Sequence, residues 1–241
     1  MATPGRALPP SSPFAGDDGS ADPTLAVALE SYRAGTTGVE DVVRALGQVR
    51  VLVPVLAELE VCDVTDEGLR VDKEASSGIV ALRAPDGRTA LPVFSSVTTM
   101  RAWATEVRPM PARAPLAAAS ALQEGWEVMV VDPGGASAVV PRPAVRALAL
   151  GEVWHPAVSG GAVRADVRAS IIGTVTCVDG VVSGDAVPGR AAEVAVVIGV
   201  RAGLDRGGLD AVLARAGAAL AADGLVASAV DSLELRVVSA P

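Results

Sequence analysis

Arg108 stands in a stretch of chain that could hold a cation in one fixed place. It directly precedes Pro109, and Pro111 follows two residues later, so the backbone around it is expected to be extended and stiff. A planar guanidinium held in this way can bind a carboxylate or a phosphate through two parallel hydrogen bonds. The alternative is an arginine that is satisfied by backbone carbonyls or by Asp132.

Two further cations could join Arg108 at an anionic ligand. Lys73 is the only lysine of the chain, and Arg88 follows Asp86 and Gly87 at the tip of an expected hairpin. If the fold brings the three cations together, they would bind a small anionic metabolite, either as a sensor or as a weak enzyme. The competing interpretation gives Lys73 a solvated ion pair with its acidic neighbours, and gives Asp86, Gly87 and Arg88 the role of a turn.

Trp103 and Asp132 are the other candidate binding residues. A tryptophan can recognise a ligand, but it is also a common anchor of a hydrophobic core. Asp132 precedes Pro133, Gly134 and Gly135, a setting in which an aspartate commonly accepts hydrogen bonds from its own turn. For both residues, the binding role and the structural role stay open.

The common catalytic and metal-binding patterns are missing from the sequence. His155 is the one histidine, and Cys62 and Cys177 lie far apart, so a zinc site and a disulfide framework are both disfavoured. The G-x-S-x-G nucleophile motif, the G-x-x-x-x-G-K-[ST] phosphate loop and the G-x-G-x-x-G dinucleotide motif are all absent. We therefore expect no metal, no cofactor and no enzymatic activity.

Composition narrows the class of protein further. The chain has 241 residues, of which 50% are hydrophobic and only 2% aromatic, so it is expected to fold around small aliphatic side chains. A formal net charge of −8 disfavours binding to nucleic acids, whose phosphates attract clustered lysine and arginine. No apolar run approaches the ~18 residues of a membrane helix. With no secretory signal in residues 1–20, we expect a cytoplasmic protein that binds no membrane.

Much of the negative charge falls in residues 58–74. Seven acids against two bases give this segment a local net charge of −5. It can be a solvated loop or a docking surface for a basic partner. A calcium site is not expected, because the regular ligand spacing of an EF-hand loop is absent. The acids are Glu58, Glu60, Asp63, Asp66, Glu67, Asp72 and Glu74.

The elements that would position these residues indicate an α+β fold. Residues 1–21 are rich in proline, serine, glycine and aspartate and are expected to form a disordered tail. Periodicity, capping residues and turn residues predict the elements of the first half. In order, these are helices 23–34 and 39–46, strand 49–57, hairpin strands 79–83 and 89–94, helix 97–107, extended segment 108–111, helix 115–124, strands 127–131 and 138–140, and a helix that ends at Leu150.

Gly160 and Gly161 mark the expected boundary between two halves. The second half is expected to contain a small sheet that helices cover on one side. The two mixed α/β sheet domains, with helices packed on the sheets, are therefore expected over 22–158 and 162–241. The predicted elements of the second are an amphipathic stretch 165–172, strands 175–182 and 194–200, helix 208–222 and strand 233–238.

Several landmarks in the first half resemble those of a known protein family. They are Asp72-Lys73-Glu74, the run from Asp86 to Ser96, Trp103, Arg108-Pro109-Met110-Pro111 and Val131-Asp132-Pro133-Gly134-Gly135. Taken in this order and spacing, they resemble the SseB N-terminal domain family, and within it the SseB-like proteins of high-GC bacteria. Val230-Asp231-Ser232-Leu233-Glu234-Leu235 is similar to the C-terminal region that accompanies this domain.

The resemblance implies a bacterial protein of a family without an established biochemical role, and it supplies no catalytic residues. We therefore expect a non-enzymatic interaction or regulatory module whose partner is another protein. Segment 58–74 and residues 103–111 would offer the binding surface. The alternative is an anionic-metabolite binding protein or weak enzyme that uses Lys73, Arg88 and Arg108, and a purely structural or oligomer-forming role is a third hypothesis.

Overall fold

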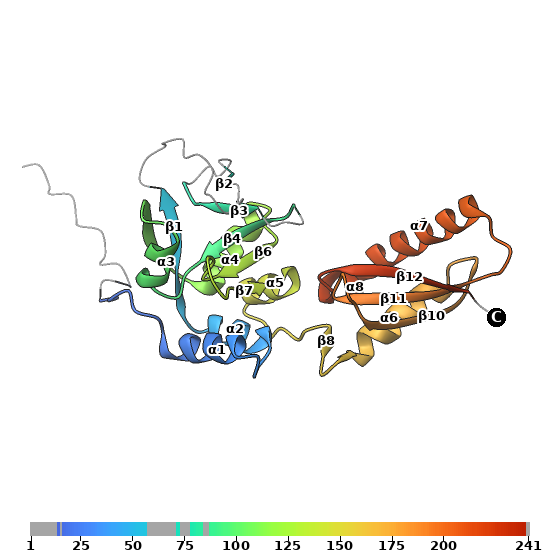
Figure 1. Cartoon of the computed structure of the whole chain (residues 1–241), viewed down its shortest axis with the longest axis horizontal. Helices are drawn as coiled ribbons and strands as arrows, with labels where there is room; N and C mark the ends of the chain where they lie inside the picture. Colours follow the sequence, from blue (N-terminus) through green and yellow to red (C-terminus); the bar gives the residue numbers. More distant parts are fainter. Residues whose placement is uncertain (1–13, 15, 57–70, 73–77, 84–86, 240–241) are drawn as a thin grey trace, which may run out of the picture. The chain divides into compact units, whose positions relative to one another are not determined.

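The chain folds into two compact units, which comprise residues 1–139 and 140–241 (Figure 1). The computed structural model describes residues 14, 16–56, 71–72, 78–83 and 87–239. Helices and several small mixed sheets alternate in both units, which confirms the expected α+β class. The division between the units falls earlier in the chain than Gly160.

The first unit begins with two helices that pack on each other, α1 (Pro23–Arg33) and α2 (Val39–Leu46) (Figure 1). Asp22 caps α1, because its side chain accepts a hydrogen bond from the Thr24 N–H at 2.8 Å. Pro23 occupies the first helical turn, where its missing N–H leaves no hydrogen bond unmade. Each helix buries one apolar side, which contributes Leu25 and Leu29 from α1 and Val42 and Leu46 from α2.

The main sheet of this unit has the strand order β2-β3-β4-β6-β7. Strands β3 and β4 form the expected hairpin, and Gly87 takes a positive φ of 86° in the turn between them. Strands β4 and β6 are parallel, with Val93 opposite Val131. The strands are β2 (Val71–Asp72), β3 (Ala81–Arg83), β4 (Thr89–Val93), β6 (Val128–Val131) and β7 (Ala138–Val140).

A second, two-stranded ribbon pairs β1 (Arg50–Leu56) with β5 (Val107–Arg113) in antiparallel register. Leu52 exchanges backbone hydrogen bonds with Phe94, which joins the ribbon to the end of β4. The segment around Arg108 is therefore extended, as its prolines require. Helix α3 (Val97–Trp103) precedes β5, and helix α4 (Ala114–Gln123) follows it.

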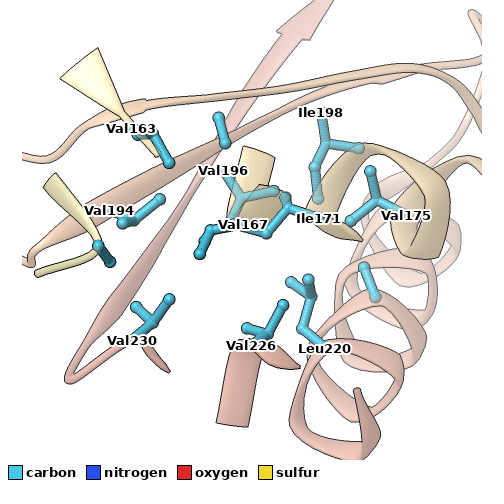
Figure 2. Packing of buried hydrophobic residues seen from close by; sticks show 13 residues of the cluster. Val163, Val167, Ile171, Val175, Val194, Val196, Ile198, Leu220, Val226 and Val230 are labelled. Atoms are coloured by element: carbon cyan, nitrogen blue, oxygen red, sulfur yellow. The ribbon is translucent and has the colours of Figure 1, made fainter. Parts of the chain in front are cut away.

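In the second unit, three strands form a sheet in the order β10-β11-β12. Strand β10 (Val181–Pro188) is antiparallel to β11 (Val194–Val200), which is parallel to β12 (Leu233–Ser239). Side chains of the helices cluster with those of one face of β11 (Figure 2). The other elements are α5 (Arg142–Leu150), β8 (Val158–Ser159), β9 (Ala162–Val163), α6 (Ala165–Thr176), α7 (Arg206–Ala222) and α8 (Gly224–Ala229).

The strand predicted over 175–182 is wrong. Helix α6 continues to Thr176, and strand β10 begins only at Val181. The reason is the spacing of Val167, Ile171 and Val175, which recur every fourth residue and so lie on one side of a helix. Figure 2 shows these three side chains in one buried cluster with residues of β11, which are Val194, Val196 and Ile198.

Candidate functional site

Asp132 lies where the carboxyl ends of two neighbouring parallel strands meet. It directly follows β6, and Ser95 lies two residues beyond the end of β4. The Asp132 N–H donates to the Val93 carbonyl at 2.9 Å, which continues the ladder by one residue. Asp132 has a φ of +50° and is the one non-glycine residue with positive φ in the part of the chain that the structure describes. This edge of a parallel sheet is a common location for binding sites.

The Asp132 carboxylate is nonetheless fully engaged within the protein. It accepts the Ser95 N–H and the Ser95 hydroxyl at 2.8 Å each, and a hydrogen bond from Arg33 Nη2 at 3.1 Å. Arg33 Nε also donates to the Ala136 carbonyl at 2.9 Å. Asp132 and Ser95 are only 6% and 4% exposed, so both side chains are almost entirely buried. These hydrogen bonds hold α1 against the loop after β6. The side-chain partner of the Ser95 hydroxyl is a carboxylate and not a histidine that could activate the serine.

A second guanidinium, that of Arg50, binds the backbone carbonyl of Ser95. Arg50 Nη1 donates to the Ser95 carbonyl at 2.7 Å, and its other nitrogens donate to both carboxylate oxygens of Asp17 and to the Ser20 carbonyl. The hydrogen bonds from Arg50 lower the pKa of Asp17 below its ordinary value. We call Asp17, Arg33, Arg50, Ser95 and Asp132 the Ser95 cluster.

The Ser95 cluster includes residues of the segment 1–21, for which a disordered tail was expected. Asp17 and Ser20 are attached to Arg50, and Val97 N–H donates to the Gly19 carbonyl at 2.9 Å. A sequence rich in serine, glycine and aspartate is therefore held in place here by a strand residue of the folded unit. Residues 1–13 and 15 lie outside the described residues.

Trp103 packs beside the loop that begins with Asp132. Its ring lies 5.3 Å from that of Phe94, with an interplanar angle of 39°. A Cβ added to Gly134 would come within 3.2 Å of Trp103 Cδ1, so the indole lies directly against this glycine. The structure therefore brings Trp103 and the 132–135 loop together, in a half-buried packing contact with Phe94 and Gly134.

Arg108 lies on a different surface feature and does not pair with Asp132, whose cationic partner is Arg33. Its side chain is exposed and has no hydrogen-bond or ion-pair partner among the described residues. Because side chains alternate along a strand, Arg108 shares one face of β5 with Met110 and Ala112. Of the charged residues that were singled out from the sequence and that the structure describes, it is the one left available to a partner.

Met110 and Ala112 line an apolar hollow between the β1-β5 ribbon and α4. Its volume is about 240 Å³, and Val53 and Trp126 form part of its wall. Apolar side chains remain exposed at it, since Met110 is 42% and Leu116 64% exposed. The polar groups in its lining come from the C-terminal part of α4 and are Ser120, Gln123 and Glu124. We call this feature the α4 hollow.

The remaining sequence-predicted features are only partly placed. Arg88 is half-buried in the turn before β4 and takes part in an interaction within the chain. Lys73 lies outside the described residues, as does the acidic segment 58–74 except for the backbone of residues 71–72. The convergence of Lys73, Arg88 and Arg108 in one anion site therefore stays a prediction.

The second unit has a hollow that the sequence did not indicate. It has a volume of about 400 Å³, lies between α5 and α8, and is lined by Arg146, Trp154 and His155 among others. The buried Nε1 of Trp154 has no hydrogen-bond partner among the described residues. Throughout the described part of the chain, no three histidine, cysteine or acidic side chains gather in a way that could hold a metal ion.

Several landmark residues of the first unit lie in or beside the Ser95 cluster, and a family model matches this part of the chain. The sequence model described as the SseB protein N-terminal domain matches residues 25–147, which is more than half of the 241 residues. The chain therefore belongs to the SseB family. Neither a curated protein nor a solved structure gives a significant match. Among the described residues, no helix has the length and apolar character needed to cross a membrane.

Proposed function

We propose that this SseB family protein is a non-enzymatic interaction module that binds a segment of another protein at the α4 hollow. The observation that carries the proposal is the combination of an apolar hollow with an exposed guanidinium on the same strand face. Arg108 and Met110 are two residues apart, which is ~7 Å along a strand. The partner segment would therefore present an aliphatic side chain next to an acidic residue.

The rigidity of the surface supports this role. Pro54 lies opposite Pro109 in the β1-β5 ribbon, and Pro111 follows on the same strand, so little backbone freedom is left to lose on binding. A preorganised site binds more tightly than one that must be ordered first. The hollow is also bordered by α4, which is anchored through four buried alanines, Ala114, Ala117, Ala118 and Ala121.

The alternative function, binding of a small anionic metabolite, rests on less. It requires Lys73 and Arg88 beside Arg108, and only the exposed Arg108 is available on the described surface. We also propose that the protein acts in the cytoplasm, on the grounds of its composition.

The test compares capture by the full-length protein with capture by two exposed apolar-to-acidic variants. Leu116→Glu places a charge at the α4 hollow, and Val27→Glu places one on α1, where Val27 is 63% exposed. A cytosolic protein that wild type and Val27→Glu retain, and that Leu116→Glu loses, would support the proposal. Equal capture by all three proteins would overturn it.

A direct measurement uses the methionines as reporters. Met110 lines the hollow, whereas Met100 and Met129 are fully buried and serve as internal controls. Titration of a blocked Gly-Leu-Asp-Gly peptide into methyl-labelled protein is expected to shift the Met110 resonance and to leave the two controls in place. A matched Gly-Leu-Lys-Gly peptide should bind more weakly, and Arg108→Gln should abolish that preference. If wild type bound the aspartate peptide and the lysine peptide equally well, the role of Arg108 would be contradicted.

A further inference from the structure

Strand β12 leaves one edge of the C-terminal sheet unpaired. It is the outermost strand of the order β10-β11-β12, and within the described part of residues 140–241 no strand pairs with its outer side. The Ser232 carbonyl accepts the Val194 N–H at 3.2 Å, so the backbone groups of Ser232 face β11. Because these groups alternate along a strand, those of Leu233, Leu235 and Val237 point outward.

The two edges of this sheet differ in how they are protected. Strand β10 ends in Pro188 and has a register shift between Val181 and Ser183, and both features discourage pairing with another strand. Strand β12 has no proline and pairs with β11 in unbroken register. Its aliphatic side chains are exposed, with Leu235 at 37% and Val237 at 40%. The β12 edge is therefore open to a further strand.

The sequence of β12 is complementary to itself in the antiparallel direction. If two copies pair about an axis at Leu235, Leu233 lies opposite Val237 of the second copy, and Glu234 lies opposite Arg236 of the second copy. The outward backbone groups then fall on the pairs that exchange hydrogen bonds. Glu234 and Arg236, which form an ion pair within each chain, fall on the intervening pairs. There the side chains lie closer, so each charge also faces the opposite charge of the second copy, which stabilises the pairing.

We propose that the protein self-associates through this edge, with β12 of two copies forming one continuous six-stranded sheet. The occupant is a second copy of the chain because both the apolar and the charged positions match when the strand meets itself in reverse. The interface is isologous, so each contact occurs twice about the axis. This inference concerns the second unit and is independent of the function proposed for the α4 hollow.

The test is sedimentation equilibrium of the full-length chain and of charge-reversed variants. Arg236→Glu places two acids opposite each other, and Glu234→Arg places two arginines opposite each other. Each variant alone is expected to raise the dissociation constant at least ~10-fold, since like charges directly opposite each other are destabilising. An equimolar mixture of the two variants restores both opposite-charge pairs and is expected to form heterodimers with near wild-type affinity.

Two further variants separate edge pairing from loss of structure. Glu234 also accepts the Arg190 and Ala191 N–H groups, so its replacement can disturb a loop. Leu235→Asp leaves that loop intact and is expected to weaken association by placing two carboxylates at the axis. The control is Arg168→Glu, whose 50% exposed side chain pairs with Asp185 of the opposite edge strand, and which should leave association unchanged.

A wild-type chain that stays monomeric at its highest soluble concentration would overturn the proposal and leave the edge to a strand of another protein. Dimers that persist in both single-charge variants and in Leu235→Asp would overturn the assigned register. Weakened variants whose mixture fails to associate would also contradict it. Association that is weak in each variant by itself and returns when the two are mixed would support the register, because two misfolded variants cannot complement each other.

Discussion

Asp132 accepts two hydrogen bonds of 2.8 Å from Ser95, one from the backbone N–H and one from the hydroxyl. This pair joins the ends of two parallel strands, and Arg33 adds a third hydrogen bond from α1. A carboxylate that accepts hydrogen bonds in this way stabilises the fold. Most of its contribution is expected to come from the two buried donors that would otherwise be unpaired.

Removal of the Asp132 carboxylate should destabilise the first unit strongly. Asp132→Ala leaves the Ser95 N–H and hydroxyl without an acceptor, and each buried donor costs about 1–3 kcal/mol, so we expect a loss of ~2–6 kcal/mol. The measurement is urea unfolding followed by the methyl resonance of Met129, which is fully buried in the same unit. Asp132→Asn keeps one acceptor oxygen and should lose less.

The matched control for that prediction is Asp179→Ala. The Asp179 carboxylate is 89% exposed and lies 3.6 Å from Arg201, a geometry worth little in water. Its loss should change the free energy of unfolding by no more than ~0.5 kcal/mol. Equal effects of the two alanine variants would contradict the structural role of Asp132.

Gly134 and Gly135 offer a comparison of adjacent positions in the loop after β6. Gly134 has a φ of +93°, and an added Cβ would lie 3.2 Å from Trp103 Cδ1, whereas a Cβ at Gly135 would meet no atom within 4 Å. Gly134→Ala is expected to cost ~1–3 kcal/mol through backbone strain and crowding of the indole. Gly135→Ala should be close to neutral. Differential scanning calorimetry of the two variants tests this, and a neutral Gly134→Ala would refute the packing described for Trp103.

The sequence predicted most of the elements of this fold, because their signals are local. The residues Asp22 and Pro23 start a helix, and Asp86 and Gly87 indicate a turn. Ser96 accepts the Thr99 N–H at 3.1 Å and so caps α3. Each of these signals acts within a few residues, so a local pattern is enough to find it. The strand placed at 175–182 shows where such patterns fail. A β-branched run has strand propensity, but Val175 completes a helical stripe with Val167 and Ile171, and burial of that stripe outweighs local propensity.

The candidate sites were harder to predict, because their partners are distant in the chain. Arg33 and Asp132 are 99 residues apart, and Arg50 and Asp17 are 33 apart, so no short spacing indicates either pair. Because the sequence contains many arginines, nothing in it distinguishes Arg33 and Arg50 from the others. Arg108 was found because its neighbouring prolines constrain it locally, whereas the α4 hollow is formed by β1, β5 and α4 together.

Gly184 and Gly173 should respond oppositely to alanine. A Cβ on Gly184 in β10 would lie 2.4 Å from Val175 Cγ2, so Gly184→Ala must displace a core side chain and is expected to cost ~1–3 kcal/mol. Gly173 lies in α6 with no atom within 4 Å of the added Cβ. Gly173→Ala should therefore stabilise the helix by ~0.5–1 kcal/mol. Amide hydrogen exchange of β11 measures both effects, and destabilisation by both variants would contradict the open space around Gly173.

Asp17 is expected to make the first unit sensitive to acid. Its hydrogen bonds with Arg50 lower the pKa of the carboxyl below the ordinary 3.8, so the folded state favours the ionised form. The resulting stability is present above pH 3.8 and is lost as the pH falls through the lowered value. The free energy of unfolding of wild type minus that of Asp17→Asn should decrease on acidification, as measured by urea unfolding followed by the Met100 methyl resonance. A difference that is constant with pH would contradict the Arg50–Asp17 contact.

Glu193 should show the opposite dependence in the second unit. Burial raises the pKa of its carboxyl above the ordinary 4.5, although the side chain accepts the Asp231 N–H at 2.7 Å. The folded state therefore holds the proton more tightly than the unfolded chain, and ionisation of Glu193 reduces stability as the pH rises through the range above 4.5. Relative to Glu193→Gln, which keeps an acceptor oxygen but does not titrate, wild type should gain stability as the pH is lowered from neutrality to about that value. Hydrogen exchange of the β11 amides at several pH values measures the difference. A change in the same direction as for Asp17 would show that burial does not dominate the pKa of this carboxyl.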